Sequence, residues 1–378
     1  MKGLVKIDSF VKNPTEKTEM KIAMDEICVS AGKNVYEVIQ AGGFDFDRVT
    51  TYVGAATGPR WLLASGFDLS LLKSGVLGNK RPVLLAGSSA GALRFAAWMQ
   101  PEPEKSYDKL IESYIAMHFT RKDTPEGILQ CIHDLIDSYI DDDAIPFALT
   151  NRKYRLAIIT ARAKRLAALN VRWLQGLALG AGFVCNALNR HRIHRFFQRV
   201  VFHSSPILPY FCLNHDFKGQ AIPLNEANFK HALLASSAVP LAAAGVRDIY
   251  GAPSGMYRDG GLIDYHLNQK YSSGKGSITL LFNHQRRLIP TWLDKRLSSR
   301  QPPGEYLEDL LMVYPSDDFI RKLSYGTVPE RGDFRRYVDN PSKRIKNWKR
   351  AVVVSGYLGE EFLGLVESGR LRDVVKKI

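Results

Sequence analysis

The sequence predicts an α/β fold, in which helices cover a sheet of mainly parallel strands. Two successive units carry this prediction: residues 49–72 and 82–100 each combine a short apolar or β-branched strand, a loop of small residues and a helical stretch. Loops that follow parallel strands lie at the same edge of the sheet, where α/β proteins place their functional sites. Further strands are expected over 155–160, 276–282 and 310–314, and a long helix over 345–366.

The composition is that of a globular protein with a large core. Of the 378 residues, 45% are apolar and 24% are charged, which suits one large domain or two average ones. The first twenty residues lack the apolar segment of a signal peptide, so we expect a cytoplasmic protein. Four scattered cysteines without a C-x-x-C pair favour reduced thiols over a structural zinc site: Cys28, Cys131, Cys185 and Cys212. We expect neither a metal nor another cofactor.

Residues 87–91, Gly-Ser-Ser-Ala-Gly, match the pattern G-x-S-x-G where the second strand meets its helix. In a nucleophile elbow of this kind, Ser89 is the reactive residue. Gly87 and Gly91 are small because a strand that turns directly into a helix leaves no room for side chains. The amide of Ala90 and the positive end of the helix then point to where an oxyanion would form. An ordinary Gly/Ser turn is the alternative interpretation.

The positive charge is concentrated in one part of the chain. The net charge is +14, and residues 144–215 contain eleven Lys and Arg but no Asp or Glu. Their apolar centre, 173–184, is too short and too rich in glycine for a transmembrane helix, but it suits a segment that lies on anionic lipid. We therefore expect the basic segment 152–199 to contact an anionic membrane surface, which would make the protein peripherally membrane-associated. A core hairpin with a solvated basic face is the alternative.

Nucleic acid is the rival partner for this basic segment. The chain has no helix-turn-helix, zinc-finger or RNP-like pattern, so a nucleic-acid partner is not expected.

Four short motifs in one order resemble those of the patatin-like phospholipase family. They are the loop at 54–58, the elbow at 87–91, Ser-Ser-Ala-Val-Pro at 236–240 and Asp-Gly-Gly at 259–261. Each is weak alone, since Asp and Gly are the commonest turn residues. Together, their order and spacing carry the resemblance, which covers about residues 45–285.

The resemblance implies a three-layer α/β/α core and a catalytic dyad of Ser89 and Asp259. Asp259 would accept the proton of the Ser89 hydroxyl directly, which requires a carboxylate with a raised pKa and a well-stabilised oxyanion. The implied oxyanion-hole residues are Gly54, Ala55, Gly58 and Ala90. The implied motif glycines are Gly87, Gly91, Gly260 and Gly261.

The chain departs from the family pattern in two places. Ala55, Ala56 and Thr57 stand where the family has a run of glycines, and Pro59 removes an amide donor. Residues 263–266 replace an Asn-Asn-Pro turn.

A conventional triad in the order Ser, acid, His is therefore kept as a rival. It would use Ser89 with Asp259 or Asp264, and His284; His266 also lies in this part of the chain.

We expect one large domain with several parts. A polar lead-in over 1–45, with room for one short helix, precedes the patatin-like catalytic unit at 46–285. This unit carries a basic, partly apolar helical cap at about 161–215. A mostly helical extension over 286–378 packs on the same domain.

The function expected is hydrolysis of carboxylic esters of phospholipids or other acyl lipids through an acyl-Ser89 intermediate. The alternatives are a non-catalytic membrane- or lipid-binding protein on the same fold, which the altered oxyanion loop favours, and an acyltransferase that uses the same acyl-serine.

Overall fold

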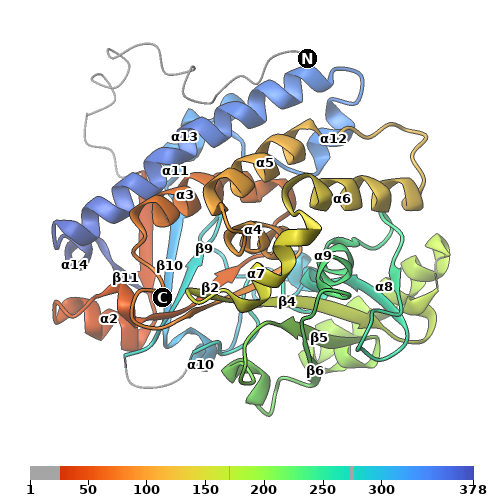
Figure 1. Ribbon diagram of the computed structural model, residues 1–378, viewed down its shortest axis with the longest axis horizontal. Helices are drawn as coiled ribbons and strands as arrows, with labels where there is room; N and C mark the ends of the chain where they lie inside the picture. Colours follow the sequence, from red (N-terminus) through yellow and green to blue (C-terminus); the bar gives the residue numbers. More distant parts are fainter. Residues whose placement is uncertain (1–25, 170, 273–275) are drawn as a thin grey trace.

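The computed structural model describes residues 26–169, 171–272 and 276–378. Its centre is a large, mostly parallel sheet flanked by helices (Figure 1), so the predicted α/β class is confirmed. The strand order is β11-β1-β10-β9-β2-β3-β4-β5-β6, and β8, with β7 beside it, pairs with β4. The strands are β1 Ile27–Ala31, β2 Val49–Gly54, β3 Val83–Ser88, β4 Tyr154–Ala163, β5 Phe197–His203, β6 Gly219–Pro223, β7 Val246–Arg247, β8 Met256–Asp259, β9 Ile278–Phe282, β10 Leu310–Pro315 and β11 Lys376–Lys377.

The helices differ between the two faces of the sheet. On one face α4 packs directly on β2 and β3, and α3, α5 and α13 extend that layer (Figure 1). The core of the other face draws largely on loop residues and on the short α10. The helices are α2 Lys33–Gln40, α3 Ala64–Ser74, α4 Ala90–Trp98, α5 Pro103–Ala116, α6 Pro125–Tyr139, α7 Ile145–Thr150, α8 Arg172–Leu188, α9 Phe229–Ser237, α10 Gly304–Leu307, α11 Asp317–Lys322, α12 Gly332–Arg336, α13 Pro341–Glu367 and α14 Leu371–Val374.

The central strands are apolar because both of their faces are covered. Every residue of β9 (ITLLF) and of β10 (LLMVYP) is buried, as expected for strands inside a sheet with two packed faces. The long helix predicted at 345–366 is α13, whose buried residues recur at helical spacing, among them Trp348, Leu358, Phe362 and Leu365.

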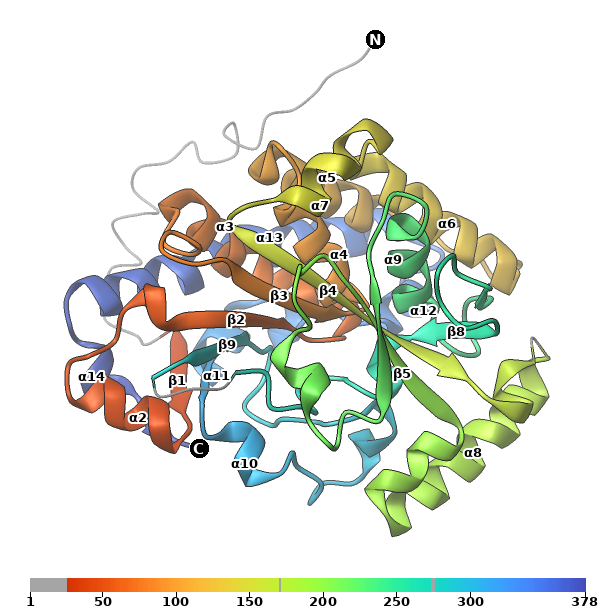
Figure 2. The same cartoon turned by 60° about the horizontal axis from the view of Figure 1, so that its bottom comes forward.

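Three parts of the expected organisation look different in the structure. Residues 27–40 of the predicted lead-in form β1 and α2, and β1 pairs with β10 inside the sheet; residues 1–25 lie outside the described part. The basic stretch 161–215 is not a separate cap throughout, because β4 runs on to Ala163 and β5 returns antiparallel to it. The part of this stretch that stands away from the sheet is α8, with short 3₁₀ helices beside it (Figure 2). Residues 286–378 add two strands, β10 and β11, as well as helices.

Three glycines let α4 approach the sheet closely. A Cβ at Gly91 would lie 2.0 Å from the carbonyl oxygen of Gly54, and one at Gly87 would lie 2.5 Å from the carbonyl carbon of Gly91. A Cβ at Gly54 would meet the Phe95 ring at 2.7 Å. Any larger residue would push the helix away from β2 and β3. This contact fixes the start of α4, and with it Ser89, at the carboxyl edge of the sheet.

Candidate active site

Ser89 occupies a strained turn between β3 and α4. Its φ of 53° and ψ of −124° lie in a region that residues with a Cβ rarely adopt. The amide of Ser89 donates a hydrogen bond of 2.8 Å to Ser236 Oγ, and Ser236 Oγ donates one of 2.7 Å to the carbonyl oxygen of Ile159. Ser236 at the end of α9 therefore ties the strained turn to β4.

Asp259 reaches Ser89 because β3 and β8 share one edge of β4. Ser88, the last residue of β3, pairs with Ile159, and Asp259, the last residue of β8, pairs with the next residue, Thr160. The two strand ends therefore meet. Ser89 Oγ donates a hydrogen bond of 2.8 Å to Asp259 Oδ2, across 170 residues of sequence.

The two glycines of the Asp-Gly-Gly motif are required because a larger side chain at either position would clash with its neighbours. A Cβ at Gly260 would lie 2.0 Å from the carbonyl oxygen of Ile159, and one at Gly261 would lie 2.7 Å from the Ala56 Cβ. The amide of Gly261 also donates to Asp259 Oδ1 at 2.7 Å. The motif thus fits Asp259 between β4 and the loop after β2.

Burial sets the protonation behaviour of the pair. Both side chains are buried, with exposed fractions of 7% each. Burial raises the pKa of the Asp259 carboxyl above its ordinary value, while the hydrogen bond from Ser89 and the charge of Arg331 oppose the shift. A carboxyl group with a raised pKa is a stronger base, which is what proton transfer from a serine hydroxyl requires.

The four predicted oxyanion-hole residues occupy different positions. Gly54 packs against α4, and Ala55 belongs to the apolar core of the opposite face. Gly58, with a φ of 56°, begins a 3₁₀ helix, Gly58–Leu63, and lines the cavity described below. Ala90 is the first residue of α4, where a helix leaves amides without an intrahelical acceptor. The Ala56 amide is already bonded to the carbonyl oxygen of Tyr265 at 2.6 Å.

A cavity of about 610 Å³ opens beside the pair, and Asp259 is part of its lining. One wall is apolar and includes the inner side of α8. Its residues include Leu179, Phe183, Val239, Leu262 and Leu293, with small Gly176 and Gly180 between them. The cavity thus combines a carboxylate held against a serine with apolar surface for a hydrocarbon chain.

A second wall of the cavity is basic and centres on Lys295. Its Nζ lies 4.2 Å from the ring centroid of Tyr265 and 5.8 Å from that of Trp292. The side chain is open to the cavity. The surrounding protein partly removes it from bulk water and, with the charges of Arg331 and Arg60, lowers the pKa of Lys295 to about 7.

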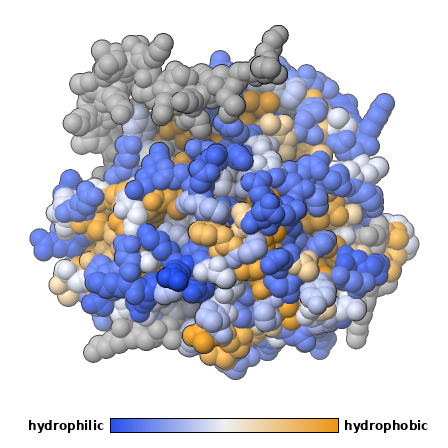
Figure 3. All heavy atoms as spheres, in the orientation of Figure 1, coloured by the Kyte–Doolittle hydropathy of each residue, from blue (hydrophilic) through white to orange (hydrophobic). Residues whose placement is uncertain are grey.

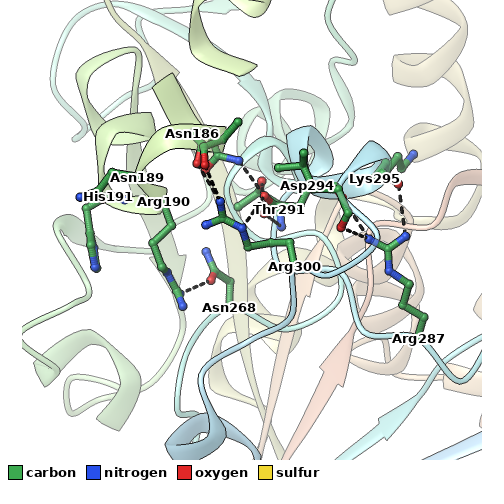
Figure 4. A network of polar contacts seen from close by, with 12 residues as sticks. Asn186, Asn189, Arg190, His191, Asn268, Arg287, Thr291, Asp294, Lys295 and Arg300 are labelled. Carbon is green, nitrogen blue, oxygen red and sulfur yellow. Dashed lines mark hydrogen bonds and ion pairs between the residues drawn. The ribbon is translucent and has the colours of Figure 1, made fainter. Parts of the chain in front are cut away.

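A polar network holds the segment that carries Lys295 (Figure 4). Asp294 Oδ1 accepts a hydrogen bond of 2.7 Å from Asn186 of α8, and its Oδ2 accepts bonds from the amide and hydroxyl of Thr291. The guanidinium of Arg287 donates to the carbonyl oxygens of Asp294 and Lys295, at 3.1 and 3.2 Å. These bonds fix the backbone of Lys295 relative to α8.

The residues of the rival triad are engaged elsewhere. Asp264 pairs with the buried Arg199 at 2.6 Å. His266 Nδ1 accepts a hydrogen bond from the Ile289 amide at 3.2 Å, and burial lowers the pKa of this imidazole to about 3. His284 lines a different cavity, and burial also lowers its pKa. The described residues thus give Ser89 Oγ a carboxylate partner and no histidine partner.

Within the described ranges, no group of three or more His, Cys, Asp and Glu side chains is arranged to hold a metal ion. In the same part of the chain, no helix has both the length and the hydropathy to span a bilayer. No protein-family model matches the chain, and no curated protein is significantly similar to it.

Sequence reasoning missed two groups of residues at this site. The basic wall, Lys295 and Arg331, lies beyond the motifs, and a Lys or Arg in a loop carries no signal of its own. Ser236 belongs to a motif found in the sequence, but its bond to the Ser89 amide depends on where α9 ends relative to β4.

The strained turn predicts an unusual effect of glycine at position 89. Relative to Ser89→Ala, which keeps the strain, Ser89→Gly relieves it, and we expect a free energy of unfolding higher by about 1 kcal/mol. Urea unfolding followed by circular dichroism measures the difference. Equal stability of the two variants, or a less stable glycine variant, would show that the turn stores no strain.

Proposed function

We propose that the protein is a patatin-like serine hydrolase that cleaves carboxylic esters of acyl lipids. The observation that carries this proposal is the buried hydrogen bond of 2.8 Å between Ser89 Oγ and Asp259 Oδ2 beside a partly apolar cavity. The motifs on which the resemblance rests also meet in space: Ser236 binds the Ser89 amide, and Gly261 packs against Ala56 of the first loop. These contacts between the motifs support the resemblance.

The reaction follows from the pair. Ser89 Oγ attacks the ester carbonyl carbon while Asp259 takes its proton, and we assign the amides of Ala90 and Gly58 as the donors to the oxyanion. The tetrahedral intermediate breaks its bond to the alcohol oxygen, which receives the proton from Asp259. Asp259 then takes a proton from water, the hydroxide attacks acyl-Ser89, and the fatty acid leaves as Ser89 recovers its proton.

The outer side of α8 supports recruitment to a membrane. Its inner residues line the cavity, whereas large apolar residues on the other side are exposed: Trp173, Leu177, Val184 and Leu188. Hydrophobic side chains lie at the surface in this part of the molecule (Figure 3). Arg172, Arg190 and Arg192 flank the helix, and an apolar side with basic flanks suits an anionic lipid surface. A membrane bound here would lie next to the cavity.

Ester turnover by site variants tests the proposal. We expect fatty acid release from anionic phospholipid vesicles and from a short-chain p-nitrophenyl ester, with kcat lowered by about 100-fold or more in Ser89→Ala and Asp259→Asn. His284→Ala is the matched control, because this partly buried side chain lines a different cavity. Loss of activity in His284→Ala as well as in the other two variants would contradict the dyad and favour the triad. No turnover by the unmodified protein would contradict the hydrolase proposal.

The pH dependence follows from the raised pKa of Asp259. Only the ionised carboxylate can accept the serine proton, so kcat/KM for a neutral short-chain ester falls as the pH drops through that raised pKa, above the usual carboxyl range near 4. Because the charge of Arg331 lowers the pKa of Asp259, Arg331→Met moves the acidic limb to higher pH. The acidic limb of the pH profile is obtained from kcat/KM between pH 4 and 9, with product release measured by chromatography. An unmoved limb, or an equal shift in exposed Lys349→Met, would contradict this assignment.

Membrane binding is tested on α8. The double variant Trp173→Ser, Leu177→Ser removes apolar area, so we expect binding to anionic vesicles to weaken by at least about tenfold in co-sedimentation. Val353→Ser, on α13, removes another exposed apolar side chain and serves as the control. Unchanged binding of the α8 variant would rule out this surface.

A further inference from the structure

The charges in the cavity beside Asp259 are unbalanced. Four basic and two acidic side chains belong to the lining: Arg60, Lys295, Arg296 and Arg331, against Asp259 and Glu330. The proposed ester hydrolysis uses Asp259, whose pKa the charge of Arg331 lowers, and gives the basic residues no contact with the substrate.

The carboxylate of Glu330 offsets only part of this positive charge. It pairs with Arg60 at 3.2 Å and also with Arg336 at 3.4 Å. Among the residues that the structure describes, neither Lys295 nor Arg331 forms an ion pair with a carboxylate. Their side chains therefore remain available to a ligand.

Lys295 and Arg331 line this cavity with exposed side chains, and their positive charges repel each other. The charge of Arg331 is, after removal from bulk water, the main cause of the lowered pKa of Lys295. The network around Asp294 holds the backbone of Lys295 in place. The residue next to Arg331 is held as well, because the Glu330 amide donates to Asp333, which accepts a bond from Trp348 of α13. A bound anion would turn this repulsion into two charge-assisted contacts.

The rest of the cavity restricts what kind of anion can bind. Its lining also includes apolar side chains, among them Leu179 and Phe183 of α8 and Leu262. Its volume of about 610 Å³ is that of a site for one small molecule. A ligand that fills the cavity is thus amphiphilic. Because Asp259 lines the same cavity, the reacting ester of such a ligand lies between its hydrocarbon chain and its anionic group.

We propose that Lys295 and Arg331 determine specificity, selecting single-chain acyl esters that carry a phosphate group a few bonds from the scissile ester over neutral esters. This inference rests on the proposed hydrolase function. A phosphate suits the site because an arginine fork and an ammonium together match its several oxygens and double charge.

Binding to an inactive protein tests the selection without turnover. In Ser89→Ala protein, calorimetry compares 1-octanoylglycerol 3-phosphate with 1-octanoylglycerol, which differ only in the phosphate. We expect the phosphate ester to bind at least about tenfold more tightly. Adding Lys295→Met or Arg331→Met should reduce this preference by about tenfold, whereas Lys295→Arg should keep most of it. Lys349→Met, an exposed lysine of α13, is the charge-matched control.

Each outcome decides between the two proposals. Equal affinity for the two ligands, or a preference that survives both methionine variants, overturns the inference. Displacement of the phosphate ester by an equal concentration of inorganic phosphate also overturns it, because the acyl chain would then contribute nothing. If the unmodified protein hydrolyses both esters with equal kcat/KM, the proposed selection for the phosphate group is wrong, but the proposed hydrolase function stands. If the phosphate ester binds more tightly but the unmodified protein hydrolyses neither ester, the selective site stands and the hydrolase function is wrong.

Discussion

The candidate site depends on one feature of the sheet: β4 is longer than β3. The first half of β4 pairs with β3, and its second half pairs along the same edge with β8, which arrives from the opposite direction. The ends of β3 and β8 therefore face each other, and the serine after one meets the aspartate at the end of the other. Gly260 and Ser236 belong to the same constraint, because both lie against the carbonyl oxygen of Ile159.

A buried polar cluster around Asp68 connects α4, the helix that follows the strained turn, to its neighbours. Asp68 of α3 accepts hydrogen bonds from Tyr52 of β2, at 2.5 Å, and from Tyr107 of α5, and pairs with Arg94 of α4 at 3.3 Å. It thereby joins three helices and a strand, and removing one partner would leave a buried charge uncompensated. We infer that the cluster holds α4 against β2 and β3, so that the strain at Ser89 persists in the folded protein.

The sequence allowed the central strands and the elbow to be predicted, because dense apolar runs and small residues report on local structure. It did not reveal β1, which is short and follows a polar stretch. The contact between Ser89 and Asp259 came from the order of the motifs, since nothing local connects residues 170 positions apart. Lys295 and Arg331 could not be found, because a basic loop residue resembles any surface residue until long-range packing places it in a cavity.

Covalent trapping of Ser89 shows directly whether Asp259 activates this hydroxyl. A fluorophosphonate reacts with serine hydroxyls that a neighbouring base activates, and tandem mass spectrometry locates the adduct and separates Ser89 from Ser88. We expect an adduct on Ser89 that forms about 100-fold or more slowly in Asp259→Asn. An adduct on another residue, no adduct on Ser89, or equal rates in the two proteins would contradict it.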